Sequence, residues 1–169
     1  MFKMNWANNP NVKFKGGGNF MGNQKKNHNS GKKEEESVQS NDDINKILNL
    51  RPENIGILIN KAEKFAEEIK AMPSSKLRDF YDYVVQIDES MSEDEDNNNN
   101  WYLKLMLLKP KMAYQASKET NKGKQIALKM LEKEFTKILD TIKNDKNKFK
   151  NFKTFFEAVV AYHKGHNNQ

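Results

Sequence analysis

Apolar residues follow one another at alternating spacings of three and four along most of the chain from Asp42 onward, which is typical of helices with one buried face. The alternation of period two that indicates a strand does not occur in the sequence. The pattern predicts an all-α fold, a compact bundle of about five helices preceded by a short helical turn. The positions expected to face the core are Ile44, Ile47 and Leu48; Ile55, Leu58, Ala62, Phe65 and Ile69; Leu77, Phe80, Tyr81 and Val84; Leu128, Leu131, Phe135, Ile138 and Ile142; and Phe152, Phe155, Phe156, Val159 and Tyr162.

Proline and serine mark where several of these helices are expected to begin and end. Pro52 suits the first position of a helix, and Pro73 stops the same helix because proline lacks the N–H that a helix interior needs. The serine pair at 74–75 can cap the next helix, since a serine hydroxyl accepts from free N–H groups of the first turn. Further boundaries are expected at residues 121–123, at a polar connector over 143–150, and at Gly165.

Residues 101–118, WYLKLMLLKPKMAYQASK, predict a helix that carries apolar residues on more than one side. Pro110 lies inside this helix, where a proline lowers the stability of the helix by ~3 kcal/mol unless the helix kinks or restarts there. The main apolar arc, which is expected to face the core, runs through Leu103, Met106, Pro110, Ala113 and Ser117. Leu105, Leu108 and Met112 lie away from this arc and are expected to contact neighbouring proteins.

Two segments have the composition of polypeptide that does not form a packed core. Residues 1–41 are rich in Asn, Lys and Gly and predict a disordered arm, either a plain tail or an RNA-binding extension that uses charge and scattered aromatic rings. Residues 88–100, DESMSEDEDNNNN, predict an acidic flexible loop, because a calcium loop would need the glycine and the ligand spacing of an EF-hand. A single helical-bundle domain is therefore expected over residues 42–169.

Composition narrows the class of protein. The 169 residues include no cysteine, which excludes disulfides and thiolate zinc sites. Mean hydropathy is −0.96, and no apolar run approaches the ~20 residues of a membrane span. The N-terminus also lacks the apolar core of a signal peptide. A cytoplasmic protein without membrane contact is expected.

Charge is divided unevenly along the chain, although the net charge is only +6. Residues 1–33 carry 7 lysines and no acidic residue. Residues 34–100 carry 7 Lys/Arg against 17 Asp/Glu, and residues 101–169 carry 15 lysines against 6 acidic residues. Such a division favours one surface for nucleic acid and another for protein neighbours.

Lysines recur every seven residues beside the apolar arc of residues 101–118, at Lys104, Lys111 and Lys118, and Lys122 follows. On an ideal helix these four residues fall within about 40° of one another, which makes a row suited to the phosphates of a polyanion. The alternative is an ordinary solvated face whose lysines extend beside the core. Two polar side chains, Tyr114 and Gln115, flank the row.

Arg78 lies in the first turn of the helix that follows Pro73, beside Ser75 and Lys76. The free N–H groups and partial positive charge of a helix N-terminus favour a phosphate there. The alternative is an ion pair with Asp82, four residues on, worth only a few tenths of a kcal/mol.

The sequence contains few residues that could form a catalytic site. The histidines are His28 in the arm and His163 and His166 near the C-terminal end, where solvent-exposed side chains are expected. No carboxylate or thiol completes a metal site with them, and no phosphate-loop motif occurs. A protein that is not an enzyme, without a metal or cofactor, is expected; a ribonuclease that uses His163 or His166 is the distant alternative.

Three segments together resemble one family: residues 73–81 (PSSKLRDFY), 108–118 (LKPKMAYQASK) and 155–164 (FFEAVVAYHK). In this order they resemble the small helical subunit of type III-A CRISPR effector complexes, the Csm complexes. The resemblance covers roughly residues 42–165. The long arm before Asp42 and the acidic insertion at 88–100 depart from the family pattern, so they have no assigned role.

The resemblance implies a non-catalytic antiviral-defence subunit that stacks in more than one copy beside the guide-bound backbone subunits. It would contact guide (crRNA) and target RNA backbones without reading sequence, within a ribonucleoprotein. The competing reading is a structural adaptor whose lysines meet acidic protein surfaces instead of RNA. Carried over by position, RNA contact falls on Ser75, Lys76, Arg78, Lys109, Lys111, Gln115 and Lys118, with Lys104 and Lys122 added by the helical-wheel argument.

Overall fold

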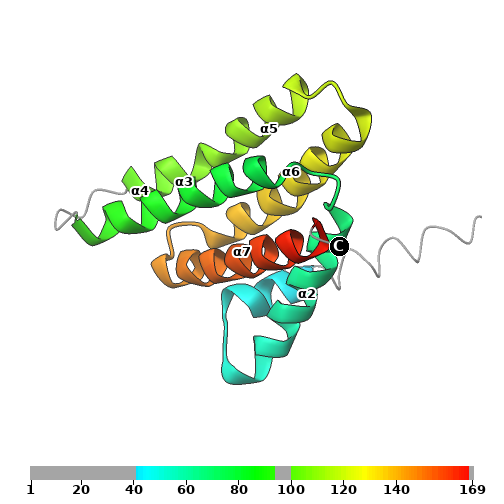
Figure 1. Cartoon of the computed structure of the whole chain (residues 1–169). Coiled ribbons are helices and arrows are strands. Elements are labelled where there is room, and N and C mark those ends of the chain that lie inside the picture. Colours follow the sequence, from blue (N-terminus) through cyan, green and yellow to red (C-terminus); the bar gives the residue numbers. More distant parts are fainter. Residues whose placement is uncertain (1–40, 94–99, 168–169) are drawn as a thin grey trace, which may run out of the picture.

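The computed structural model describes residues 41–93 and 100–167, and all regular structure within these ranges is helical (Figure 1). This confirms the predicted all-α fold. The expected arm lies outside the described residues, apart from Asn41, which is already helical. The elements are a helix over 41–48, a 3-10 turn η1 (Pro52–Asn54), α2 (Ile55–Glu68), α3 (Ser74–Glu93), α4 (Asn100–Met106), α5 (Leu108–Lys118), α6 (Lys122–Ile142) and α7 (Lys146–Asn167).

Helix α7 lies in the middle of the bundle (Figure 1). α2 and α3 both pack against α7, and α6 joins α7 to α5. One hydrophobic cluster runs through all of these helices, and its centre is aromatic. The ring of Phe135 on α6 lies 4.6 Å from that of Phe156 and 5.2 Å from that of Phe152, both on α7, in edge-on geometry. Phe65 on α2 completes this group at 6.0 Å from Phe135.

The predicted core positions of the 41–48 helix, α6 and α7 are buried, apart from Tyr162, which is half-buried. Those of α2 and α3 are also buried, except Tyr81, which is half-buried, and Ile55, which is 51% exposed. Pro52 opens the 3-10 turn that leads into α2, as predicted. Pro73 does not stop α2, which already ends at Glu68; it directly precedes α3, in which Ser74 and Ser75 are the first helical residues. Pro73 also supplies the carbonyl that accepts from the N–H groups of Lys76 and Leu77 in the first turn of α3.

Several predicted boundaries are wrong because helices extend further than the polar sequence suggests. The acidic segment does not begin at Asp88, since α3 continues to Glu93 and Asp88 forms an ion pair with Lys153 on α7. The rest of that segment, residues 94–99, lies outside the described residues.

The connector predicted over 143–150 is also shorter than expected. α7 begins at Lys146, and Phe149 is fully buried. The carboxylate of Asp145 accepts from the N–H groups of Asn147 and Lys148 at 2.9 and 3.1 Å, as a helix cap does. At the other end, Gly165 lies inside α7, which continues to Asn167.

Residues 101–118 form two helices instead of one, which is the main departure from the predicted number of elements. α4 ends at Met106, Leu107 is a turn residue, and α5 starts at Leu108. Pro110 therefore lies in the first turn of α5, where backbone N–H groups need no partner within the helix. The helix restarts ahead of the proline, which avoids the cost of a proline in a helix interior.

The apolar face of α4 and α5 that enters the core is the opposite of the predicted one. Leu105, Leu108 and Met112, expected to contact other proteins, are fully buried. Leu103, expected in the core, is 60% exposed, and Pro110 is exposed as well. Of the predicted arc, Met106 and Ala113 are half-buried and Ser117 is exposed. Both faces are apolar, so periodicity alone could not decide between them.

The first turn of α6 depends on Asn121, where a break was predicted. Asn121 is the N-cap of α6, and its side-chain oxygen accepts from the N–H of Lys124 at 3.1 Å. We expect Asn121→Ala to lower the free energy of unfolding by about 1 kcal/mol, the usual cost of a lost cap. Urea unfolding followed by circular dichroism measures this, and Asn121→Asp, which keeps the acceptor, is the matched control. Equal losses in the two variants would contradict a capping role.

Candidate nucleic-acid interface

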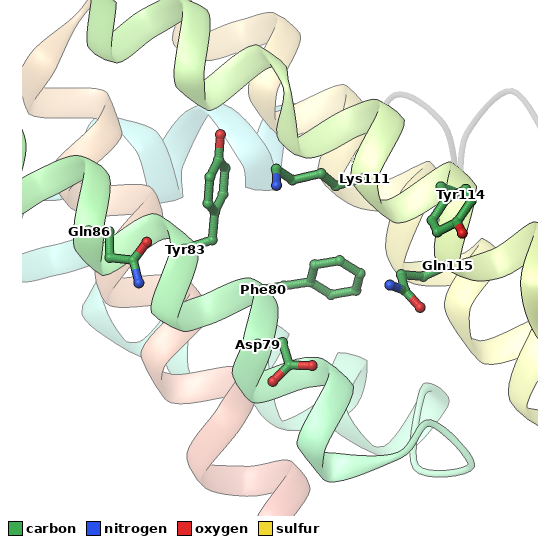
Figure 2. Close-up of a pocket in the computed structure, with 7 residues that line it drawn as sticks. All are labelled: Asp79, Phe80, Tyr83, Gln86, Lys111, Tyr114 and Gln115. Carbon is green, nitrogen blue, oxygen red and sulfur yellow. The ribbon is translucent and has the colours of Figure 1, made fainter.

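A groove separates α3 from α5. α3 packs on α4 and α7, whereas α5 packs on α6, and between them lies a cavity of about 360 Å³. Figure 2 shows side chains from both helices turned toward this space, with Lys111 reaching from α5 toward Tyr83 on α3. The lining residues are Asp79, Phe80, Tyr83, Gln86, Lys111, Tyr114 and Gln115.

Lys111 is held at this groove by an aromatic ring. Its Nζ lies 4.5 Å from the centre of the Tyr83 ring, within the range of a cation–π interaction. The Tyr83 hydroxyl donates a hydrogen bond of 2.8 Å to the carbonyl of Lys104, and burial raises the pKa of Tyr83. Tyr83 is therefore a fixed, neutral platform that places the ammonium group of Lys111 beside the cavity.

The groove continues past Gln115 into a second cavity of about 230 Å³, because Gln115 lines both. Lys76 of α3 and Lys118 of α5 line this second part. The Nζ of Lys118 lies 5.9 Å from the ring centre of Tyr114, and that of Lys76 lies 3.7 Å from the carboxylate of Asp79. We call the two cavities together the α3–α5 groove; it gathers Lys76, Lys111, Gln115 and Lys118.

Arg78 and Ser75 occupy a different cavity, of about 260 Å³, between the start of α3 and the end of α7. Lys164 lines it as well, so two cationic side chains from two helices meet there. Among the described residues Arg78 has no ion pair, which removes the alternative of a bridge to Asp82.

The other lysines named from the sequence do not line the groove. Lys109 forms an ion pair with Asp140 on α6, on the far side of α5. Lys104 lies on α4 with its Nζ 3.5 Å from the hydroxyl of Ser90. Lys122 is exposed at the first position of α6. The break at Leu107 separates Lys104 from the row, so the four lysines do not form one straight ladder.

Sequence reasoning named Lys76 of α3 as a site residue but missed Tyr83 and Gln86, which also line the groove. Both follow Phe80 at spacings of three, and of these three residues only Phe80 had an expected place, in the core. Asp79 also lines the groove, and Glu119 lines its second part, so the site is not purely cationic. Helical wheels of α3 and α5 can identify the residues that line the groove only once it is known that the two helices are neighbours.

The histidines near the C-terminal end are not both exposed, which corrects the expectation from the sequence. His163 is 1% exposed and hydrogen-bonds to the backbone of Ile69 and Met72. His166 is 28% exposed, with its Nδ1 3.3 Å from the carboxylate of Glu67. Burial lowers the pKa of His163 despite its backbone hydrogen bonds, so it is held neutral as part of the packing between α7 and the end of α2.

Stability should fall in mild acid because of His163. Its folded pKa is lowered from 6.5, so below about pH 6.5 the unfolded chain binds a proton that the folded protein resists. Stability is therefore complete above that pH and is lost as the pH falls toward the folded pKa. We expect a lower urea midpoint at pH 5.5 than at pH 7.5, and a smaller difference in His163→Leu. An unchanged difference in the variant would rule out His163 as the cause.

Neither a metal site nor a membrane-spanning helix is found among the described residues. No group of three or more His, Asp or Glu side chains in 41–93 and 100–167 could hold a metal ion. None of the helices in these ranges is long and apolar enough to cross a membrane.

Comparison with known proteins agrees with the resemblance in the sequence. A family model described as Csm2 Type III-A matches residues 52–169, which is more than half of the chain and includes α2 to α7. No curated protein and no solved structure matches the chain. The matched range contains all three segments that carry the resemblance, and both sides of the α3–α5 groove. The chain therefore belongs to the Csm2 family, the small subunits of type III-A CRISPR effector complexes.

Proposed function

We propose that this subunit is non-catalytic and binds the backbone of guide or target RNA through the α3–α5 groove, without reading sequence. The observation that carries the proposal is the meeting of Lys76, Lys111, Gln115 and Lys118 from two helices in one groove. Lysine suits this task because a point charge on a flexible stem tolerates any base sequence. Sequence would be read by pairing between guide and target.

The spacing within the groove fits an extended phosphate chain. Lys111 and Lys118 are seven residues apart on α5, which places their backbones about 10 Å apart along the helix. At this separation the two ammonium groups can meet different phosphates of the same strand. The ion pair between Lys76 and Asp79 is exposed and worth little, so a phosphate can replace the carboxylate.

Polar and aromatic side chains add contacts beyond charge. Tyr114 is 60% exposed at the groove, so its ring can stack on a base or ribose of any sequence. Gln115 can donate to a phosphate or a 2′-hydroxyl. These contacts would favour RNA without selecting a sequence.

Arg78 and Ser75 provide a second contact point at the start of α3, outside the groove. Lys104, Lys109 and Lys122 are weaker members of the proposed interface. Lys109 would have to leave Asp140 before it could meet a phosphate, and Lys104 would have to leave Ser90. RNA contact is therefore expected to depend mainly on Lys111, Lys118 and Arg78.

Membership of the Csm effector complex supplies the other expected partners, namely the guide-bound backbone subunits and further copies of this chain. A cytoplasmic location follows from that role. His163 lines the cavity that holds Arg78, but it is 1% exposed and hydrogen-bonds to the backbone of Ile69 and Met72, which argues against its use as the general base of a ribonuclease.

The competing function is a structural adaptor whose lysines meet acidic protein surfaces. RNA binding by the Lys111→Ala/Lys118→Ala/Arg78→Ala variant separates the two functions. The proposal requires salt-dependent binding of single-stranded RNA by the native chain and a clear loss in the variant. Equal RNA affinity of the two proteins would reject the proposal in favour of the adaptor.

A further inference from the structure

The two cavities of the α3–α5 groove differ in the kind of side chain that lines them. The second cavity has a positive lining, because Lys76 and Lys118 supply two charges against one from Glu119. The larger cavity, of about 360 Å³, is lined by one cation and one carboxylate, Lys111 and Asp79, whose formal charges cancel. Its other lining residues are three aromatic rings and two amides, namely Phe80, Tyr83, Tyr114, Gln86 and Gln115. A lining of this kind suits a flat, neutral, hydrogen-bonding ligand better than a phosphate.

Aromatic side chains form the apolar part of the larger cavity. Figure 2 shows Phe80 directed from α3 across the space toward α5, which carries Tyr114 and Gln115. Phe80 is 5% exposed and belongs to the hydrophobic core, so the small surface that it shows to the cavity is held in place by packing. Tyr114 is 60% exposed, so most of its ring is available to a ligand. The cavity therefore combines a fixed apolar floor at Phe80 with an open ring at Tyr114.

Tyr114 is better placed than Tyr83 to stack on a ligand. The Nζ of Lys111 lies 4.5 Å from the centre of the Tyr83 ring and covers one of its faces. Tyr83 is also half-buried, and its hydroxyl is engaged with the carbonyl of Lys104. The Nζ of Lys118 comes only within 5.9 Å of the Tyr114 ring centre, close to the limit of about 6 Å for a cation–π interaction. A tyrosine ring in this position can stack on any nucleobase, because every base has a π face.

Hydrogen-bonding groups reach the same cavity from both helices. Gln86 is exposed on α3 and Gln115 is half-buried on α5. A side-chain amide both donates and accepts, so it can meet the polar edge of any base. Asp79 adds a carboxylate, which repels a phosphate but accepts from the exocyclic amino group of adenine, cytosine or guanine. The polar groups of the cavity therefore match the edge of a base.

We propose that the larger cavity binds one unpaired nucleobase of the RNA, stacked on Tyr114 above Phe80, while Lys111 and the second cavity hold the neighbouring phosphates. This rests on the proposed function, and it adds that a base enters the groove together with the backbone. A paired base has its edge engaged by its partner and its faces covered by the stack, so it cannot enter. The groove is therefore a site for nucleotides that are not paired.

RNA oligomers with and without bases test this site at constant charge. A short single-stranded RNA of mixed sequence and an abasic ribose–phosphate oligomer of the same length carry the same phosphates. Binding of the backbone alone would give them equal affinity. We expect the full native chain to bind the RNA about tenfold more tightly than the abasic oligomer, measured by fluorescence anisotropy. Tyr114→Ala should remove most of this difference and change the affinity for the abasic oligomer by less than about twofold.

Two control variants separate the base from the backbone. Leu103→Ala removes a side chain that is also 60% exposed but does not line the groove, so it should leave both affinities unchanged. Lys111→Ala/Lys118→Ala removes phosphate contacts and should weaken the binding of both oligomers by the same factor. The ring variant and the lysine variant thus act on different parts of the same ligand.

Equal affinity of the native chain for RNA and for the abasic oligomer would overturn this inference and leave the groove proposal intact. An unchanged preference for bases in Tyr114→Ala would also overturn it. Free adenosine monophosphate bound as tightly as the RNA would overturn it as well, since the ligand would then be a mononucleotide. Unchanged binding of the abasic oligomer by the lysine variant would instead count against the proposed function.

Discussion

Replacing Lys111, Lys118 and Arg78 together by alanine is expected to weaken the binding of single-stranded RNA by about 10- to 100-fold at moderate salt. Each of these cations would neutralise one phosphate and release its counterions. The slope of log affinity against log salt should therefore decrease by about 2 in magnitude, at ~0.7 for each lost phosphate contact. Fluorescence anisotropy with a labelled RNA at several salt concentrations measures both quantities.

The matched control removes the same charge elsewhere. Lys129, Lys133 and Lys150 are exposed and lie on α6 and α7, outside the α3–α5 groove, so their replacement by alanine should cost much less affinity. Splitting the triple variant separates the two cavities: Lys111→Ala/Lys118→Ala tests the groove and Arg78→Ala tests the pocket with Lys164. Equal losses in the control and in the triple variant would mean that only net charge matters.

Phe135→Ala should be the most destabilising single change considered, lowering the free energy of unfolding by about 3–5 kcal/mol. Phe135 is fully buried, and its ring meets Phe65, Phe152 and Phe156 at distances of 4.6 to 6.0 Å. Alanine loses the transfer free energy of the ring and leaves a cavity bounded by three helices. Because the free energy of unfolding of a native protein is only about 5–15 kcal/mol, this substitution should remove a large part of it.

Urea unfolding measures this loss, with Ile126→Ala as the control. Ile126 is on the same helix but is 59% exposed, so its replacement should change stability by less than about 0.5 kcal/mol. If Phe135→Ala costs less than about 1.5 kcal/mol, the aromatic cluster does not hold α2, α6 and α7 together in the way described. Should the variant fail to fold, Phe135→Leu gives the same comparison with a smaller cavity.

Sequence periodicity was sufficient to predict the buried face of α6 but not that of α4 and α5, and the two outcomes have the same physical reason. α6 has apolar residues on one side, so only one face can enter the core, and all five predicted positions are buried. Residues 101–118 have two apolar faces, and the choice between them depends on the helices that pack against them. Pro110 showed that the helix must be irregular, but the position of the turn at Leu107 follows from packing.

The candidate site was predictable only in part for a similar reason. The spacing of seven correctly put Lys111 and Lys118 on one side of α5. Their environment depends on Tyr83 and Lys76 of α3, which a wheel of α5 cannot show. Lys109 is only two residues from Lys111, yet it lies about 160° away around the helix and pairs with α6.

The central position of α7 has a consequence for how the protein is made. α7 follows all the other described helices in the chain, yet it is the surface on which α2 and α3 pack. Roughly 80 residues separate the end of α2 from the start of α7, which a ribosome takes about 4–16 s to synthesise at 5–20 residues per second. Throughout that interval the apolar face of α2 lacks its main native partner in the nascent chain, which is α7. Folding of the bundle must therefore be completed late in synthesis, and the growing chain is most prone to aggregate before α7 emerges.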